Sequence, residues 1–321
     1  MNERILLYVS LFALLAIPHS ASAADPTDTT VVATVGDDPI EASEVKQLMD
    51  LIPVARRPTG DLLAMAQAQM LEEIVNRRLV VAYAQRSGDA PSAEALAKAK
   101  KQLQLRLSAQ GRKAPNGQAE QAADAELDRQ VLWRLIWDRY LAKYRTPERR
   151  KAWFQSHHRD VDGTELVVSH ILLRPDSTAG PKDLEALEKQ AAAIRAEITS
   201  GKTEFAQAAA KYSGGPSGKQ GGRLGKIGRH GPMDEAFSRA AFELEKGQIS
   251  PPIRSPFGIH LICCDEVVPG SKQISEVAAA IDDALAQELL TRIAGIEREK
   301  TAVKYTEAWP HFKPGTQELA K

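Results

Sequence analysis

The sequence has little cysteine: Cys263 and Cys264 are the only two in 321 residues, and they are neighbours. A bridge between adjacent residues would strain the peptide that joins them, so the sequence predicts two thiols on opposite faces of a strand. Two ligands are too few for a structural zinc site, which is almost always four-coordinate. We therefore expect neither a disulfide nor a zinc site at this pair.

The sequence also lacks net charge. Its 42 basic residues balance its 42 acidic residues, so no overall basic field favours nucleic acid as a partner. Hydrophobic residues make up 43% of the chain and charged residues 26%, which is the composition of a globular protein. The sequence thus predicts a folded protein that does not bind nucleic acid.

The apolar run from Ile5 to Ile17 is too short to cross a bilayer as a helix, which takes about 20 residues. Arg4 precedes the run and the small residues Ala21-Ser22-Ala23 follow it, an order typical of a secretory signal peptide. We expect cleavage before Ala24, and a soluble protein in the periplasm or another extracytoplasmic space, without stable membrane insertion. Retention of the segment as an uncleaved anchor is the alternative.

The chain is longer than a single hydrophobic core usually supports, so two or more domains are expected. A block of mixed helix and strand in the middle has a different pattern from the mainly helical flanks. We therefore predict a signal peptide at residues 1–23, a helical domain at 24–162, a separate domain at 163–268, and a C-terminal segment at 269–321 that completes the helical domain.

The flanks begin with a β-branched strand at residues 29–36, which Ile40 resumes before a helix that starts around Ala42. Apolar residues at helical spacing predict further helices at about 61–88, 92–110, 120–144, 147–157 and 274–298. The last helix has an apolar stripe that nothing local buries, so we expect it to pack on the N-terminal helices. A strand at 303–305 should pair with residues 31–35, because an isolated strand leaves its backbone groups unpaired.

The middle block predicts strands at residues 165–173, 223–227 and 252–267, and helices at 181–200, 203–212 and 233–244. Short helices mixed with antiparallel strands make an α+β unit. His170 and His260 each lie in an apolar strand of this block. The pattern alone leaves the strand order open.

Four segments of the block carry a family resemblance. They are Glu165-Leu-Val-Val-Ser-His170-Ile-Leu-Leu173, Gly221-Gly-Arg-Leu-Gly225, Gly231-Pro-Met-Asp-Glu-Ala-Phe237 and Gly258-Ile-His260-Leu-Ile-Cys-Cys264. In this order they resemble the parvulins, a family of peptidyl-prolyl cis/trans isomerases, and the strand, turn and helix after residue 29 resemble the start of SurA- and PrsA-type chaperones. The resemblance implies a parvulin domain, an antiparallel sheet with short helices, inserted in a mostly helical chaperone-like domain.

The resemblance also implies a substrate-binding pocket. Leu224, Met233 and Phe237 match the residues that enclose the proline ring, and Phe257 matches a position that flanks the pocket. Met233 and Phe237 are four residues apart, so both lie on one face of a helix. The same spacing is common in an ordinary helical core, which is the alternative interpretation of this pair.

The resemblance assigns a catalytic group to His170, His260 and Ser213. The two histidines match a pair on the central strands that hydrogen-bond to each other, and Ser213 and Ser169 stand beside matched positions where they could join that network. A buried histidine is otherwise most often a satisfied core residue. No carboxylate or further histidine accompanies the pair at ligand spacing, so a metal-dependent enzyme is a disfavoured alternative.

Two positions depart from the family pattern. Gly215 stands in Tyr212-Ser-Gly-Gly-Pro-Ser217, where the family usually carries a cysteine or aspartate near the reacting carbonyl oxygen. Arg223 stands where an acidic residue is common, which we interpret as a surface change. Because the polar group is missing at Gly215, we expect an isomerase activity that is weak but real.

Prolyl isomerisation has an uncatalysed barrier of about 18 to 20 kcal/mol, because rotation breaks the amide resonance. Apolar enclosure and positioned hydrogen bonds can lower this barrier without a cofactor or metal. The resemblance therefore implies an isomerase that assists the folding of unfolded or nascent exported polypeptides containing proline. The alternative is a holdase chaperone with a weakly active or inactive parvulin domain, and the sequence does not separate the two.

Overall fold

The structure, a computed structural model, describes residues 29–52, 61–109, 118–174, 181–231, 233–255, 257–314, 316 and 319–320. The predicted signal peptide lies outside these residues. The chain divides into two compact units. The inserted unit is Arg150–Ile281, and the outer unit consists of the described residues of Asn2–Arg149 and Asp282–Lys321. Because both flanks of the chain contribute to the outer unit, the inserted unit interrupts it in sequence, as the resemblance implied.

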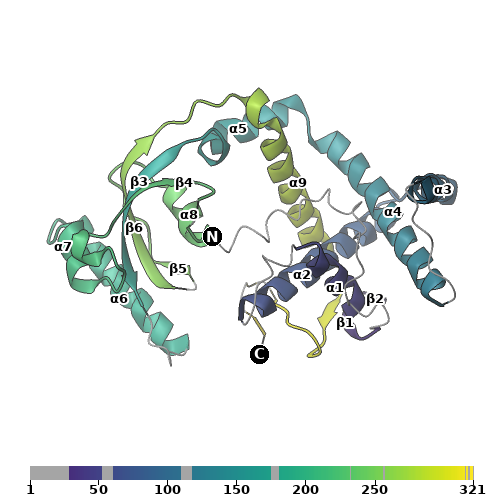
Figure 1. The fold of residues 1–321 in the computed structure, drawn as a ribbon, viewed down its shortest axis with the longest axis horizontal. Helices are drawn as coiled ribbons and strands as arrows, with labels where there is room; N and C mark the ends of the chain where they lie inside the picture. The colour runs from purple at the N-terminus through teal and green to yellow at the C-terminus, as the bar shows by residue number, and fades with distance from the viewer. Residues whose placement is uncertain are drawn as a thin grey trace. The chain divides into compact units, whose positions relative to one another are not determined.

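The inserted unit is built on a four-stranded antiparallel sheet with the order β4-β3-β6-β5 (Figure 1). Its strands are β3 (Glu165–Leu173), β4 (Arg223–Gly228), β5 (Ile253–Ser255) and β6 (Gly258–Val268). Every residue of β3 has a partner on β6, from Glu165 opposite Val268 to Leu173 opposite Ile259. The two histidine-bearing strands are therefore the central pair of the sheet.

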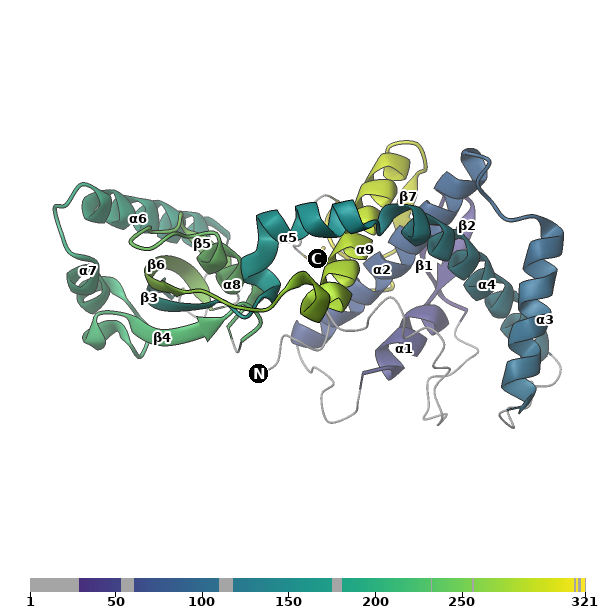
Figure 2. The same cartoon turned by 90° about the horizontal axis from the view of Figure 1, so that it is seen from above.

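Helices cover both faces of this sheet. Figures 1 and 2 show α6 (Pro181–Thr199) and α7 (Phe205–Tyr212) on one face and α8 (Glu235–Phe242) on the other. A short 3-10 helix, η3 (Gly218–Gln220), lies in the loop between α7 and β4. Alternate residues of the central strands join two separate cores: Ile171, Leu173, Ile259 and Leu261 pack toward α6 and α7, and Leu166, Val168, Ile262 and Cys264 pack toward α8.

The outer unit contains a three-stranded antiparallel sheet with the order β2-β1-β7. Its strands are β1 (Val31–Val35), β2 (Asp38–Glu41) and β7 (Val303–Tyr305). Ala33 lies opposite Tyr305, and Val35 lies opposite Val303. The predicted pairing between the two ends of the chain is confirmed.

The helices of the outer unit are α1 (Ala42–Asp50), α2 (Asp61–Arg86), α3 (Ala93–Ala109) and α4 (Gln118–Tyr144). Two further helices, α5 (Pro147–Val161) and α9 (Ile274–Arg298), each begin in one unit and end in the other. None of the helices in the described ranges is both long enough and apolar enough to cross a membrane.

The C-terminal part of α9 packs on α2. Ala294 lies in the same core cluster as Leu71 and Val75, and the Arg298 guanidinium contacts Glu72. The predicted apolar stripe of α9 is buried throughout: Val277, Ile281, Leu285, Leu289 and Ile293. The prediction that the last helix packs on the N-terminal helices is confirmed.

Candidate active site

The two histidines lie side by side in the centre of the inserted unit. Leu172 is opposite His260, and His170 is opposite Ile262, so the histidines are diagonal neighbours on one face of the sheet. Their Nδ1 atoms are 3.4 Å apart, and the residues are 8% and 5% exposed. The prediction that both are buried and within hydrogen-bond reach of each other is confirmed.

The surroundings keep both rings neutral. Burial lowers the pKa of His170, and burial together with the neighbouring His170 lowers the pKa of His260 to about 4. The Phe237 ring, from α8, meets the two imidazoles edge-on at centroid distances of 5.9 and 5.4 Å. Near pH 7 the pair therefore offers neutral hydrogen-bonding groups, with an aromatic side chain beside them.

Ser255 extends the pair, and the sequence analysis missed it. Its Oγ lies 2.7 Å from His260 Nε2 and accepts a hydrogen bond from the Phe257 backbone N–H. Ser255 lies in β5, two residues from the register position opposite His260. The sequence does show a serine just before the turn that leads into the strand of His260. Which residue that serine contacts depends on the register of the hairpin, which the sequence pattern does not give.

Gly215 lies directly beside the histidine pair. A Cβ atom at this position would be 3.3 Å from His170 Nε2 and 3.4 Å from Ser213 Oγ. His170 Nε2 is buried and has no hydrogen-bond partner in the described structure. The family resemblance places a polar side chain at position 215. In this chain that position is a glycine, and it faces the unpartnered His170 Nε2.

Ser213 holds the loop that carries Gly215. Its Oγ accepts hydrogen bonds from the backbone N–H groups of Leu172, at 3.1 Å, and of Gly215, at 3.3 Å. The Gly214 N–H in turn donates to the Leu172 carbonyl. Ser213 thus ties the loop to β3 through the backbone.

Three of the four predicted pocket residues come together. Leu224 and Met233 are half-buried against the core cluster that contains Phe237, and Phe237 itself is 3% exposed. The Asp234 carboxylate caps α8 by accepting from the backbone N–H groups of Ala236 and Phe237. Met233 precedes this cap, so the prediction that Met233 and Phe237 share one face of a helix is wrong. Phe257 differs from the other three, because it is 60% exposed at the turn between β5 and β6.

Ser169 does not join the histidine network. Its Oγ donates a hydrogen bond to Asp265 at 2.7 Å, because neighbouring residues of a strand point to opposite faces. Cys263 and Cys264 are both free thiols. Burial, together with Asp265, raises the pKa of Cys263 to about 12, so this cysteine is not a thiolate nucleophile at neutral pH.

A metal site does not compete with this interpretation in the described part of the chain. Its His, Cys, Asp and Glu side chains form no group of three or more that could hold a metal ion. The two central histidines are joined instead to each other and to Ser255. The arrangement is that of a hydrogen-bonded site beside apolar side chains.

Residues 170–266 match the family model described as Rotamase, the PPIC-type PPIase domain. The matched range runs from β3 to β6 and includes both histidines, Gly215 and the cluster around Phe237. The inserted unit therefore contains a parvulin-type domain with the fold of a peptidyl-prolyl isomerase.

The wider chain is similar to the SurA chaperones. Chaperone SurA of Methylobacillus flagellatus is 28% identical over 271 residues, which cover 79% of this chain and 60% of that protein. Chaperone SurA of Salmonella typhimurium is 43% identical over 103 residues, 32% of this chain and 23% of that protein. The chain thus spans about 60% of the length of its first relative.

A solved structure of PrsA from Bacillus anthracis also matches. It is 22% identical, covers 72% of this chain and 96% of its own, and has a TM-score of 0.32.

Proposed function

We propose that this chain assists the folding of exported polypeptides and that its parvulin-type domain catalyses cis/trans isomerisation of peptidyl-prolyl bonds. The proposal rests on Phe237, whose ring meets both histidines edge-on, and on Leu224 and Met233, which pack against the same core cluster as Phe237. Apolar side chains at this place can hold a proline ring and exclude water. Water exclusion favours the twisted amide of the transition state, whose carbonyl is less polar than that of the planar amide.

The neutral histidines suit this reaction. Rotation of an amide creates no full charge, so neutral dipoles in fixed positions can supply the hydrogen bonds of the site. In the proposal His170 and His260 hold the floor under the proline ring, Ser255 orients His260, and Ser213 sets the loop at the entrance. Phe257, exposed at the turn, contacts the peptide beyond the proline. No cofactor enters the reaction.

The test is a proline-limited peptide isomerisation assay on the protein. Met233→Ala should lower kcat/KM about tenfold or more, because it removes an apolar contact that holds the proline, and tenfold corresponds to about 1.4 kcal/mol of transition-state stabilisation. Phe237→Ala should do the same, but Phe237 is also a core residue, so the half-buried Met233 is the more informative site. His157→Ala, on exposed surface of α5, serves as the control and should leave the rate unchanged.

A second candidate function is the holding of unfolded clients. It is favoured by Gly215, which leaves the site without the polar side chain that the family resemblance places there, and by the name Chaperone SurA of the relatives. If the protein does not accelerate isomerisation above the uncatalysed rate but suppresses client aggregation, the isomerase proposal is wrong and the holdase proposal stands.

We also propose that the protein acts outside the cytoplasm and that residues 163–268 are the domain responsible for isomerisation. The signal-like segment at residues 1–23 and the similarity to SurA chaperones support the location. Fractionation of cells, followed by N-terminal sequencing, should find the protein outside the cytoplasm with Ala24 as its first residue. A cytoplasmic protein that keeps Met1 would contradict this.

A further inference from the structure

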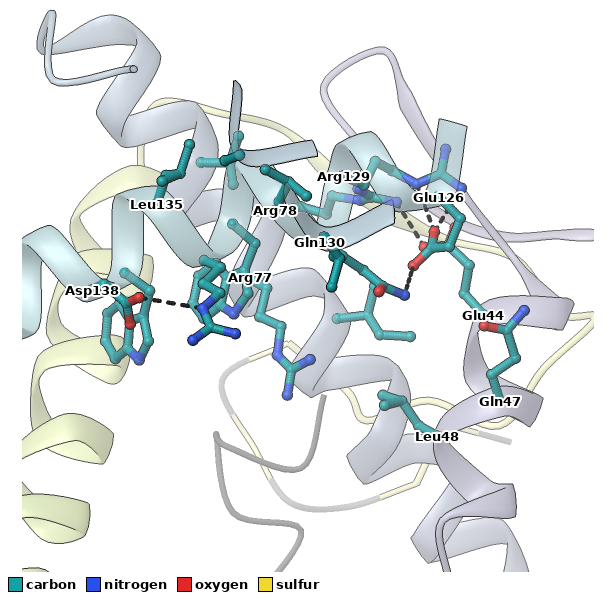
Figure 3. Close-up of a pocket in the computed structure, with 18 of the residues that line it drawn as sticks. Glu44, Gln47, Leu48, Arg77, Arg78, Glu126, Arg129, Gln130, Leu135 and Asp138 are labelled. Carbon is teal, nitrogen blue, oxygen red and sulfur yellow. Dashed lines mark hydrogen bonds and ion pairs between the residues drawn. The ribbon is translucent and has the colours of Figure 1, made fainter. Parts of the chain in front are cut away.

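The outer unit contains a hollow of about 440 Å³ between α1, α2, α3 and α4. Figure 3 shows side chains of α1 and α4 on facing sides of it, among them Leu48 and Gln130. A volume of this size is in the range of sites that bind small ligands or peptide side chains. It lies in a different unit from the histidine site, so the proposed isomerase activity does not account for it.

The helices turn one face each toward this hollow. On α3 the lining residues are Ala99, Gln102, Leu103 and Arg106, spaced i, i+3, i+4 and i+7, and α2 repeats the same spacing from Ile74 to Val81. Residues at this spacing form a single stripe along a helix, which in a globular protein usually packs on another element. Here several stripes border the same open volume, and some of their apolar members, such as Leu51, Leu103 and Leu135, are only half-buried and so remain available to an occupant.

Part of the wall is apolar and aromatic. Trp133 and Trp137 line it, with their rings stacked at a centroid distance of 5.1 Å. Leu48, Ile74 and Val131 also line it. The buried Nε1 atom of Trp137 has no hydrogen-bond partner in the described structure, so this wall also holds an unsatisfied donor. A side chain of aliphatic or aromatic type fits such a surface.

The charges around the hollow are unbalanced. Among the described lining residues, five arginines face three carboxylates. Three of the arginines are paired with those carboxylates: Arg78 with Glu44, Arg129 with Glu126 and Arg134 with Asp138. Arg77 is paired with Glu73, outside the lining.

Arg106 is the arginine that remains for an occupant. It is exposed on α3 and forms no ion pair with the residues that the structure describes. Its neighbour in the stripe, Leu103, is half-buried. The exposed part of the rim therefore combines a positive charge with an apolar side chain, which complements an occupant that carries a negative charge next to an apolar group.

We propose that this hollow binds an unfolded polypeptide segment in which an apolar side chain is flanked by acidic residues. The apolar side chain enters between the helices, and the acidic flank pairs with Arg106 at the rim. The inference rests on the proposed handling of unfolded clients and assigns it a binding site and a preferred client sequence. A peptide fits better than a small inorganic anion, because most of the wall is not polar.

The test measures fluorescence anisotropy of labelled peptides with the full chain. The first peptide alternates leucine or phenylalanine with glutamate, the second has lysine in place of glutamate, and the third has serine in place of the apolar residues. The first should bind best, and the second and third about tenfold more weakly, a difference of about 1.4 kcal/mol.

Two matched pairs of variants on α3 locate the site. Arg106→Glu should weaken binding of the acidic peptide about tenfold, whereas Lys101→Glu, the same charge change on an exposed residue outside the lining, should not. Leu103→Ser should weaken it too, whereas Leu105→Ser, at a residue 62% exposed and outside the lining, should not.

Equal losses in a variant and its control would overturn the proposal, and so would a peptide preference for lysine over glutamate. Binding of anionic lipid vesicles with no binding of the acidic peptide would also overturn it. The isomerisation assay separates the two proposals: Arg106→Glu should leave that rate unchanged, whereas Met233→Ala should lower it and leave the peptide preference intact. A chain inactive in isomerisation but selective for acidic apolar peptides would refute only the isomerase proposal.

Discussion

Each unit has a polar network that joins segments distant in the sequence, and the two networks differ in their chemistry. In the inserted unit, two neutral histidines and a serine form a hydrogen-bonded chain at the centre of the sheet. In the outer unit, Arg298 contacts Glu72, and the Tyr305 hydroxyl donates to the same carboxylate at 2.6 Å. These partners lie more than 200 residues apart in sequence.

The difference between the two networks follows from which segments of the chain make up each unit. The inserted unit comes from one continuous stretch, so neutral groups on neighbouring strands can be placed by local packing. The outer unit needs both flanks of the chain, and charged partners tie the late segment to α2. We therefore expect changes at glycines and histidines to act on the inserted unit and changes at the C-terminal segment to act on the outer unit.

The largest expected effect is at Gly222, in the inserted unit. This residue has a φ of +81°, and a Cβ there would lie 2.3 Å from the His170 carbonyl oxygen, a backbone atom that cannot move away freely. Gly222→Ala should therefore lower the free energy of unfolding of the inserted unit by roughly 3 to 5 kcal/mol, the sum of a left-handed backbone and an overpacked contact. Hydrogen exchange of the β3 amides would report the stability of the inserted unit, and exchange of the β1 amides would report that of the outer unit.

Gly228→Ala is the matched control, because a Cβ at Gly228 meets nothing within 4 Å. It should change the exchange of β3 amides little. If both variants lowered protection equally, or if β1 amides lost protection as much as β3 amides, the proposed separation between the units would be wrong.

The second effect is on the outer unit. A chain that ends at Lys300 loses β7, and with it the partner of β1 on one side and the half-buried side chains of Val303 and Tyr305. Burial of each such side chain contributes up to about 1.5 to 3 kcal/mol. The β1 amides should therefore exchange at least about a hundredfold faster, which corresponds to a loss of roughly 2.7 kcal/mol in the free energy of opening. Protection of β3 amides should stay the same.

Tyr305→Phe sharpens this prediction. It keeps the strand but removes the hydroxyl that donates to Glu72, so it should cost only about 1 kcal/mol. A loss from the single hydroxyl as large as that from the truncation would show that the polar network, rather than strand pairing, holds the C-terminal segment.

The third effect separates the units by pH. The pKa of His260 is about 4 in the folded protein because of burial, and about 6.5 in an unfolded chain. Between these values the unfolded chain binds more protons than the folded one, so the inserted unit loses stability as the pH falls, by about 2 kcal/mol at pH 5. The lowered pKa of His170 acts in the same direction.

The outer unit should respond in a lower pH range. The Arg86 guanidinium lowers the pKa of Glu297 below its ordinary value of 4.5, so the stability that this pair supplies is present above that value and is lost only as the pH falls through the folded pKa. Exchange of β3 amides should therefore rise between pH 7 and 5 while that of β1 amides, corrected for intrinsic exchange, stays level. His260→Gln should remove most of the change in β3, and an unchanged slope would contradict the assignment to His260.

The sequence predicted the inserted unit closely where local pattern decides. The strand at residues 165–173 has the same bounds as β3, and the predicted helix at 181–200 is α6 within one residue. Apolar runs bounded by glycine and proline define such elements without knowledge of their neighbours. The absence of Ser169 from the histidine network could also have been predicted, since strand alternation alone places its side chain on the face away from His170.

Features that depend on register or on several helices were not predictable in the same way. The bond from Ser255 to His260 requires the pairing of β5 with β6. The hollow in the outer unit requires the arrangement of four helices, whose patterns each indicate only that one face is apolar. The strand pairing across the chain ends was predicted because unpaired backbone groups require a partner and the pattern offered few candidates.

The last expected effect is on catalysis and tests whether the missing polar side chain at Gly215 lowers the rate of isomerisation. Gly215 has a backbone conformation that accepts a side chain, since its φ is not in the left-handed range, and its Cβ would lie beside His170 Nε2. The carboxylate of Gly215→Asp would restore a polar group near the reacting carbonyl and give Nε2 a partner. We expect kcat/KM for the proline peptide to rise about tenfold, which is less than the 10² to 10³ typical of one preorganised polar contact because the histidine pair is already in place. Gly215→Ala fills the same space without a polar group and should give no rise. An equal rise in both variants would mean that packing around His170, and not the missing polar group, limits the rate.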